Sequence, residues 1–288
     1  MPKKVNTEKR KGEENYNKFG SLMIIQEYIN SSNIIIYFPK YDWSTKTTYD
    51  YFKKGKPVCP YEPRVFGIGY IGVGPYASKI NGKTTLEYNT WSQMLRRCYD
   101  SNSRAKYPSY KDCTVVEEWL NFQTFAQWFT DNYYEVLNEE MHLDKDILVK
   151  NNKIYGPDTC CIVPARINYL FRCKNGNDKD LPKGVIKRKY PNKTKYRAVY
   201  NRCDNHKSYR INIGTFDSIE EAFAAYKEVK ESYIKEVANQ YKDSIPNNVY
   251  NALMEREVEL SDDNSSDKHV YNIFKYIRIG RIKLNEQN

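Results

Sequence analysis

The sequence contains no run of apolar residues long enough to cross a membrane. Residues 1–20 are basic and polar, and no apolar segment follows the charges as it does in a secretory signal peptide. We therefore expect neither a signal peptide nor a membrane span, and no membrane as a partner.

Cysteine pairs with the spacing of a zinc or redox clip are also absent. The seven cysteines are an odd number, and no two of them form a CxxC pair. The expectation is reduced thiols in a cytosol.

The charge balance is basic, because 46 Lys and Arg against 36 Asp and Glu give a formal net charge of +10. Apolar residues make up 40% of the chain, which is enough for packed cores and too many for a disordered chain. The 27 tyrosines, mixed with many lysines, favour a nucleic-acid surface, since cations meet phosphates while rings stack. Codon usage in an AT-rich genome is the alternative explanation for the tyrosines.

The first part of the chain predicts a charged arm over residues 1–15 and a small β-rich module over residues 16–62. Two runs rich in β-branched residues, 23–28 and 33–38, are separated by Asn-Ser-Ser-Asn, which is typical of a β-hairpin. The sequence indicates a weakly basic surface for this module and does not predict its function.

A glycine pattern follows, with GxGxxG at Gly67, Gly69 and Gly72. A dinucleotide-binding fingerprint requires a helix that opens on the third glycine, whereas Val73, Gly74 and Pro75 follow here. The pattern favours a glycine-rich loop or strand pair over a nucleotide site.

Two helices are predicted next. Thr90 and Gln93 form a capping-box pattern, so the first helix is expected to begin at Thr90. The second spans residues 121–136 and has aromatic residues at helical spacing, which favours a hydrophobic core over a cofactor site.

Residues 141–171 read as a short acidic strand, a turn at Asn151 and Asn152, an apolar strand over 160–163 and a helix that starts at Pro164. This order resembles the ββα-metal motif of the HNH endonucleases, especially the phage-encoded homing type. The resemblance implies that Asp144 is the metal-binding acid, that Asn152 braces the loop and that Asn168 is the last metal ligand.

The chain departs from that pattern at Lys145, which stands where the family has the histidine that deprotonates water. A lysine is protonated at neutral pH and cannot serve as this base without strong desolvation. His142 has the right chemistry, and on a strand residues 142, 144 and 146 project to one face. We therefore predict His142 as the base, with Asp144, Asp146 and Asn168 as ligands of one Mg²⁺ or Mn²⁺ ion. The alternative is an exposed strand edge without a metal.

Residues 181–241 predict three strands, over 184–190, 195–201 and 208–214, and a helix that starts at Ser218 with Glu221 completing a capping box. This segment resembles the Apetala-two or ethylene-response-factor DNA-binding domain, which also occurs in phage homing endonucleases. The resemblance rests on Gly184-Val185, on 195–198 and on 213–226, although Tyr196 replaces a tryptophan of the plant members.

Double-stranded DNA is the partner that this resemblance implies, since a basic three-stranded sheet can enter the major groove. A solvated basic face without a ligand is the alternative. The candidate DNA-binding residues are Lys187, Arg188, Lys189, Lys195, Tyr196, Arg197, Arg202, Lys207 and Arg210.

The sequence therefore predicts an α+β protein of several domains: the arm, the β-rich module, an HNH-like region over 63–175, the DNA-binding domain over 181–241, and a linker with a basic tail over 242–288. We expect a phage HNH-type homing endonuclease that cuts DNA with one divalent metal in the cytoplasm of a bacterial host. The alternative is an inactive DNA-binding regulator, or an inhibitor of a host system, without a cofactor. The oligomeric state stays open.

Overall fold

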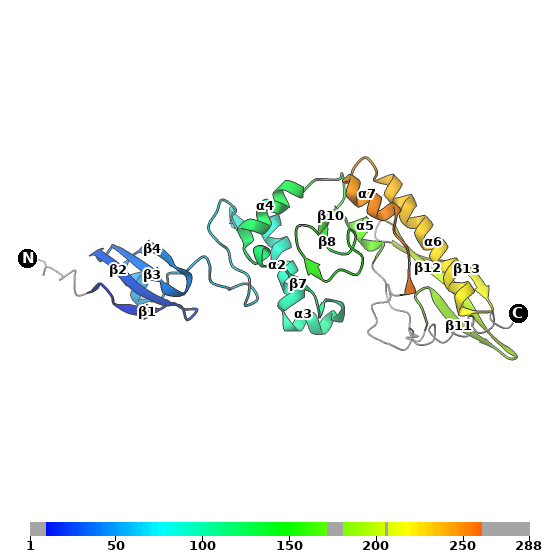
Figure 1. Ribbon diagram of the computed structural model, residues 1–288, viewed down its shortest axis with the longest axis horizontal. Coiled ribbons are helices and arrows are strands. Elements are labelled where there is room, and N and C mark those ends of the chain that lie inside the picture. Colours follow the sequence, from blue (N-terminus) through cyan, green and yellow to red (C-terminus); the bar gives the residue numbers. More distant parts are fainter. Residues whose placement is uncertain (1–9, 172–180, 205–206, 261–288) are drawn as a thin grey trace, which may run out of the picture. The chain divides into compact units, whose positions relative to one another are not determined.

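The computed structural model describes residues 10–171, 181–204 and 207–260, without the side chains of residues 203, 204, 207 and 208. The fold is α+β, as predicted, and it divides into two compact units, residues 1–131 and residues 132–288 (Figure 1). The predicted HNH-like segment 63–175 spans this division. The side chain of Lys207 and residues 1–9 and 261–288 of the predicted arm and tail lie outside the described residues.

Unit 1 starts with an antiparallel sheet in the order β1-β2-β3-β4, followed by one short helix. Its elements are β1 (Glu14–Tyr16), β2 (Leu22–Asn30), β3 (Asn33–Phe38), η2 (Pro39–Tyr41), β4 (Trp43–Thr47) and α1 (Tyr49–Lys53). The predicted hairpin is β2 and β3, because apolar residues alternate toward one face and the turn residues follow them. Residues 14 and 15, expected in the arm, pair with β2.

The core of this sheet contains residues from β2 and β3 together with Phe52 of α1 and Cys59. Met23, Ile25, Ile34 and Ile36 are fully buried within it. The alternating strands therefore have one buried face, as the hairpin pattern predicts.

The rest of unit 1 is mainly helical. Its elements are β5 (Lys79–Ile80), β6 (Lys83–Thr84), α2 (Leu86–Tyr99), α3 (Ser101–Lys106), η3 (Pro108–Tyr110), β7 (Thr114–Val115), η4 (Glu117–Leu120) and α4 (Phe122–Asn132). The predicted start of α2 at Thr90 is wrong, because the helix begins at Leu86 and the Thr90 hydroxyl instead donates to the Leu86 carbonyl at 2.9 Å. The aromatic stripe of α4 is core, as predicted.

The glycine pattern serves packing in unit 1. A Cβ atom on Gly69 would lie 2.3 Å from the Leu95 side chain, and one on Gly72 would lie 2.2 Å from the Asn121 amide. The two glycines thus let the loop backbone approach α2 and the residue that precedes α4. No helix opens on Gly72, so the loop lacks the geometry of a dinucleotide-binding turn.

Unit 2 contains the segments for which chemistry is predicted. Its elements are β8 (Met141–Asp144), β9 (Ile154–Tyr155), β10 (Cys161–Pro164), α5 (Ala165–Tyr169), β11 (Val185–Tyr190), β12 (Lys193–Asp204), β13 (Lys207–Phe216), α6 (Ile219–Gln240) and α7 (Asn247–Met254). β8 pairs antiparallel with β10, and β11, β12 and β13 form an antiparallel sheet in that order. The predicted strands and helix of 181–241 are confirmed.

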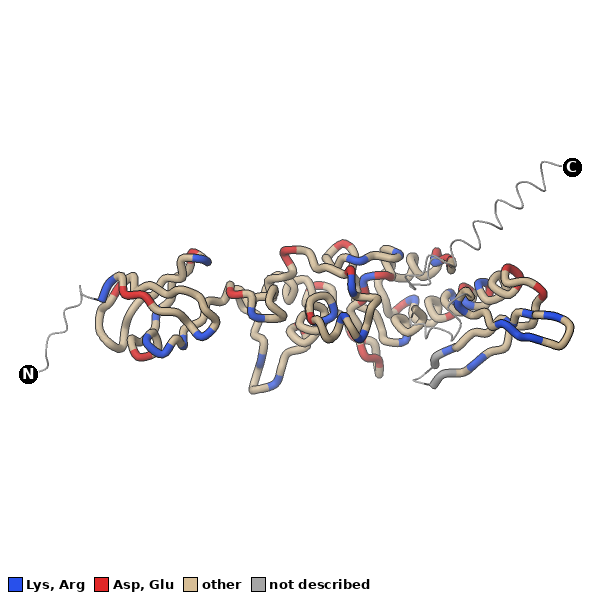
Figure 2. The backbone as a smooth tube through the Cα atoms, turned by 90° about the horizontal axis from the view of Figure 1, so that it is seen from below, with Lys and Arg blue, Asp and Glu red and all other residues tan. Residues whose placement is uncertain are grey.

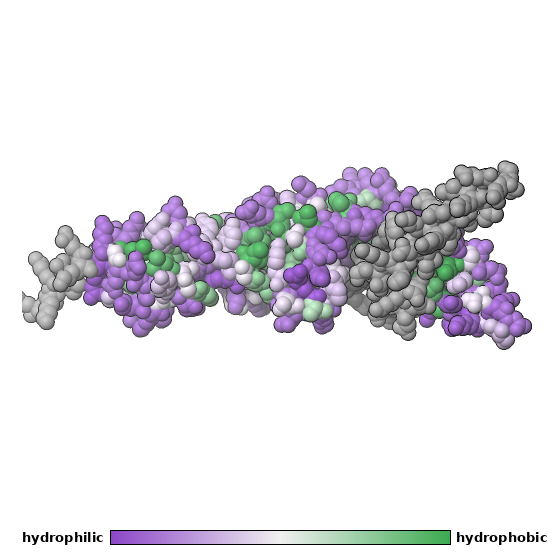
Figure 3. All heavy atoms as spheres, turned by 60° about the horizontal axis from the view of Figure 1, so that its bottom comes forward, coloured by the Kyte–Doolittle hydropathy of each residue, from purple (hydrophilic) through white to green (hydrophobic). Residues whose placement is uncertain are grey.

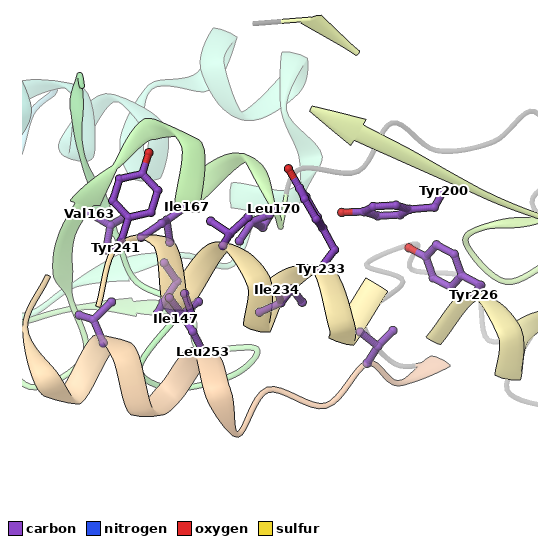
Figure 4. Close-up of a cluster of buried hydrophobic side chains, with 14 of the residues drawn as sticks. Ile147, Val163, Ile167, Leu170, Tyr200, Tyr226, Tyr233, Ile234, Tyr241 and Leu253 are labelled. Atoms are coloured by element: carbon purple, nitrogen blue, oxygen red, sulfur yellow. The ribbon is translucent and has the colours of Figure 1, made fainter. Parts of the chain in front are cut away.

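One hydrophobic core runs through unit 2 (Figure 4). Ile147, Val163 and Ile167 from the β8–α5 region share it with Tyr226 and Tyr233 of α6. The β8–β10–α5 region and the three-stranded sheet therefore share one core with α6 and are not separate domains.

Free thiols are present at Cys59, Cys98, Cys113, Cys160 and Cys161. On the face in Figure 3, apolar side chains gather in small areas among hydrophilic ones. Among the residues that the structure describes, no helix combines the length and apolar character that a membrane crossing requires.

Candidate nucleic-acid interface and candidate metal site

Helix α6 covers one face of the β11–β13 sheet. The ring of Tyr200 in β12 lies 6.2 Å from that of Tyr226 and 5.7 Å from that of Tyr233, measured between centroids (Figure 4). The covered side also includes Ala198 and Phe216. A β-bulge shifts the register of β12 and β13 between Ala198 and Val199. Alternation along the strands then assigns the neighbouring residues to the opposite face.

The start of the helix is fixed by the predicted capping box. The Ser218 hydroxyl accepts from the Glu221 amide at 3.1 Å, and the Glu221 carboxylate accepts from the Asp217 amide at 3.3 Å. The reciprocal bond thus reaches one residue further back than the standard box. This local signal positions the helix beneath the sheet.

Gly184 brings the sheet close to the helix. Its φ is +79°, and a Cβ there would lie 2.1 Å from the Tyr226 ring. Only glycine combines this backbone conformation with this contact.

The face away from α6 is called the free face here. Residues that alternate with Ala198 and Tyr200 occupy it, and the register places Arg188 opposite Lys195 and Asn201 opposite Arg210. Strand residues 185–190, 193–202 and 209–216, whose side chains the structure describes, include no Asp or Glu. Figure 2 shows Lys and Arg gathered on the β11–β12 hairpin. The polar residues of the free face in the middle of the sheet are Arg188, Lys195, Arg197, Asn201, Arg210, Asn212 and Thr215, and the same register adds Ile186, Tyr190, Lys193 and the buried Val199.

The cations of the free face are mostly unneutralised. Within the described part of the chain, Arg188, Arg197 and Arg210 make no ion pair, whereas Lys195 pairs with Asp217. Hydrogen bonding to Lys195 lowers the pKa of the Asp217 carboxyl, so this pair stays charged at neutral pH. Asn201 and Asn212 were not named in the sequence analysis, because it looked for cations. Alternation along β12 and β13 places both on the free face.

Four of the predicted DNA-binding residues lie on the covered side. Tyr196 packs against the core, and the Arg202 guanidinium lies 4.4 Å from the Tyr233 ring centre and 3.4 Å from Glu236. Lys187 and Lys189 also face this side, near the hairpin turn, where they are exposed. Tyr196 and Arg202 therefore serve the packing of α6, because helix coverage and not charge decides the face.

The second site lies where β8, β10 and α5 meet. The Asn168 amide nitrogen lies 3.3 Å from Nδ1 of His142, and Nε2 of His142 lies 3.4 Å from the Glu140 carboxylate. Since an amide nitrogen can only donate, Nδ1 is the acceptor and the ring proton sits on Nε2 beside Glu140. The Tyr169 ring packs edge-on against His142 at 5.7 Å. The structure thus brings together the predicted residues His142 and Asn168, and it adds Glu140 and Tyr169, which the sequence analysis did not name.

Asp144 ends the strand that carries His142. Its Oδ1 accepts from the backbone amides of Asp146 at 2.7 Å and Ile147 at 2.8 Å, which turns the chain away. The expectation that residue 146 continues the strand face is therefore wrong. Burial, with the nearby charge of Asp146, raises the pKa of the Asp144 carboxyl above its ordinary value.

Lys145 is buried behind the site. Its ammonium lies 2.7 Å from both carboxylate oxygens of Asp146 and donates to the Asn152 carbonyl at 2.7 Å. Asp146 is thus engaged by a cation, and this contact competes with its predicted role as a metal ligand. Lys145 itself is a structural cation in the loop rather than a candidate base.

Asn152 joins the two ends of the loop. Its amide nitrogen donates to the carbonyls of Lys145 at 3.0 Å and Ile154 at 2.6 Å, and its oxygen accepts from the Ile154 amide at 3.1 Å. The nitrogen and the oxygen of the Asn152 side chain therefore both form hydrogen bonds to backbone atoms, as expected of a residue that braces the loop between β8 and β9.

The donor set suits a hard divalent cation. Asp144 has a second carboxylate oxygen with no partner among the described residues, and Asn168 offers an amide oxygen beside His142. Magnesium commonly binds through one or two protein oxygens and completes its shell with water and phosphate. No cluster of three or more His, Cys, Asp or Glu ligands occurs within residues 10–171, 181–204 and 207–260. The carboxylate and amide oxygens are the ligand type that Mg²⁺ and Mn²⁺ prefer.

Comparisons with protein-family models, with curated proteins and with solved structures found no match to this chain. Function is therefore inferred from the two surfaces described above.

Proposed function

We propose that the protein binds double-stranded DNA through the free face of β11–β13 and cuts it as an HNH-type endonuclease through the site around His142. The observation that carries the proposal is the free face itself, which presents Arg188, Arg197 and Arg210 from strand segments 185–190, 193–202 and 209–216 that contain no Asp or Glu. A face of this kind attracts a polyanion.

Double-stranded DNA fits this face in shape and in chemistry. A three-stranded sheet can lie in the major groove, where arginine reads guanine and asparagine reads adenine. Asn201 of β12 pairs with Arg210 of β13, and Arg197 lies in the same strand as Asn201, so cations for phosphates and amides for base edges occur on one face.

For cleavage, His142 takes the proton of the attacking water on Nδ1, which requires that the water replace the Asn168 amide as the donor to this nitrogen. The Glu140 carboxylate beside Nε2 then stabilises the imidazolium that forms. Asp144 and Asn168 would hold the divalent metal, which would stabilise negative charge on the scissile phosphate and on the leaving oxygen. Asn152 fixes the loop that follows Asp144 through its bonds to the carbonyls of residues 145 and 154.

A second function, favoured by one specific observation, is a DNA-binding regulator or inhibitor without turnover. Lys145 lies at the position of the family's base, and its ion pair with Asp146 fills that space. The free face would then bind DNA in the same way, and the His142 region would be a scaffold.

Incubation of the purified protein with supercoiled plasmid in Mg²⁺ or Mn²⁺ separates the two functions. The endonuclease predicts nicked or linear product that requires the metal. Salt-sensitive retention of duplex DNA without product in either metal supports the regulator. Absence of salt-sensitive duplex binding overturns both.

A further inference from the structure

The β1–α1 part of unit 1 carries three exposed aromatic rings outside its core, Tyr16 in β1, Phe19 in the β1–β2 turn and Tyr51 in α1. Tyr16 is 61% exposed, Phe19 is 49% exposed and Tyr51 is 49% exposed. Large rings at this exposure lose hydrophobic stabilisation unless a ligand covers them.

The turn that carries Phe19 is rigid. Buried Asn17 accepts through its side-chain oxygen from the amides of Phe19 at 3.0 Å and Ser21 at 2.9 Å. Its amide nitrogen donates to the Glu62 carboxylate at 2.6 Å. The ring is therefore held outward by a preorganised turn, which lowers the entropy cost of binding a partner.

Cations lie over two of these rings. The Lys18 ammonium is 4.9 Å and the Arg64 guanidinium 5.2 Å from the Phe19 ring centre, and the Lys56 ammonium is 4.5 Å from that of Tyr51. None of the three cations forms an ion pair with a residue that the structure describes. Lys53 and Lys54 nearby differ, because Glu13 and Asp50 neutralise them.

The rings belong to one surface, because Gly55 joins the two chain segments that carry them. The Lys18 amide donates to the Gly55 carbonyl at 3.0 Å, and a Cβ on Gly55 would lie 2.8 Å from the Tyr16 carbonyl oxygen. Lys56 follows directly, and its amide donates to the Tyr51 carbonyl at 3.0 Å. We call this the ring surface, formed by Tyr16, Lys18, Phe19, Tyr51, Lys56 and Arg64.

We propose that the ring surface binds single-stranded DNA. Exposed rings stack on unpaired bases, and cations beside them contact the phosphates that link those bases. In a duplex the bases already stack on one another, so the rings gain little from it. The inference concerns unit 1 alone and does not depend on duplex binding or cleavage by unit 2.

The test measures binding of the full chain to a fluorescent oligothymidylate by anisotropy. Phe19→Ala and Tyr51→Ala should each weaken binding by roughly fivefold or more, the range of a lost base stack. Phe19→Trp should keep the affinity because it keeps the ring. Ile29→Ala is the matched control, since Ile29 is 47% exposed on β2 and lies outside the ring surface. Equal affinity of the wild type and the two alanine variants would overturn the proposal.

Two further measurements separate the ring surface from the free face. Arg197→Ala should weaken duplex binding and leave oligothymidylate binding unchanged, and Phe19→Ala should do the reverse. Photocrosslinking with iodouridine oligonucleotides should label the peptides that contain Phe19 or Tyr51. Labels confined to unit 2, or a Phe19→Ala variant that loses self-association instead of DNA binding, would contradict the inference.

Discussion

The side-chain amide of Asn168 in α5 lies 3.3 Å from Nδ1 of His142 in β8. The two residues are 26 positions apart in the chain, and they meet because β10 pairs with β8 and leads directly into α5. With the Asn168 amide nitrogen as the donor, Nδ1 is the acceptor and the ring proton is on Nε2.

His142→Ala should abolish nicking, with a loss of about 10²- to 10⁴-fold in rate, because it removes the proposed base. Lys145→Met should keep nicking, since its ammonium is bound to Asp146. Rates on supercoiled plasmid at saturating Mg²⁺ measure both. Nicking that survives His142→Ala but is lost in a folded Lys145→Met variant would reverse the assigned roles.

Arg197→Ala should weaken duplex binding and lower the slope of log affinity against log salt by about one, because one phosphate contact is lost. Lys235→Ala is the matched control, since it removes the same charge from an exposed position of α6. Titrations at several salt concentrations give both slopes. An unchanged slope for Arg197→Ala would place this arginine away from DNA.

Lys145→Met should destabilise unit 2 by about 1–3 kcal/mol. The substitution removes the buried ammonium, so the Asp146 carboxylate and the Asn152 carbonyl lose their hydrogen-bond donor. All four tryptophans precede residue 132, so tryptophan fluorescence follows unit 1 and circular dichroism adds unit 2. Urea unfolding should show a shift in the second signal only. Lys235→Met serves as the control, and an equal shift in both variants would argue against a role for the buried ion pair.

Gly184→Ala should destabilise unit 2 by more than Gly82→Ala destabilises unit 1. The two glycines have φ of +79° and +77°, but a Cβ on Gly82 meets nothing within 4 Å whereas one on Gly184 meets the Tyr226 ring. The strain of an alanine at positive φ costs about 1 kcal/mol of unfolding free energy. A larger loss of stability for Gly184→Ala would therefore come from the overlap of its Cβ with the Tyr226 ring. Equal losses in urea unfolding would mean that Tyr226 moves aside without cost.

Alkaline pH should weaken unit 2 through Tyr241. Burial, helped by the hydrogen bond to Glu139, raises the pKa of Tyr241 from 10.0 to about 12. Between these values the folded state holds a proton that the unfolded state has lost, so stability falls as pH rises from about 10 to about 12, by about 1–3 kcal/mol.

Tyr241→Phe should reduce this loss, as measured by urea unfolding across that pH range. Burial also raises the pKa of Tyr134, which remains in the variant, so the pH dependence should shrink and not vanish. An undiminished dependence would show that Tyr241 is not the group that titrates.

Features carried by neighbouring residues were predictable from the sequence. The β2–β3 hairpin follows from alternation around Asn-Ser-Ser-Asn, and α6 follows from Ser218 and Glu221. The start of α2 was not predictable with the same rule, because the N-cap residue Thr85 makes no side-chain capping bond and its hydroxyl instead donates to the Ala77 carbonyl. The end of β8 at Asp144 has a local cause that the strand pattern hides, namely the side-chain turn of that residue.

By itself, the sequence determined the elements, since periodicity, caps and turn residues act within a few positions of one another. It also determined the basic character of the β11–β13 strands, because Lys and Arg far outnumber their single acidic residue, Asp204. Only the tertiary structure decided which of these cations face outward, because that depends on where α6 packs and on the bulge at Ala198 and Val199. It alone also set Asn168 against His142 and Lys145 against Asp146, since contacts of buried polar groups depend on how strands pair and not on residue type.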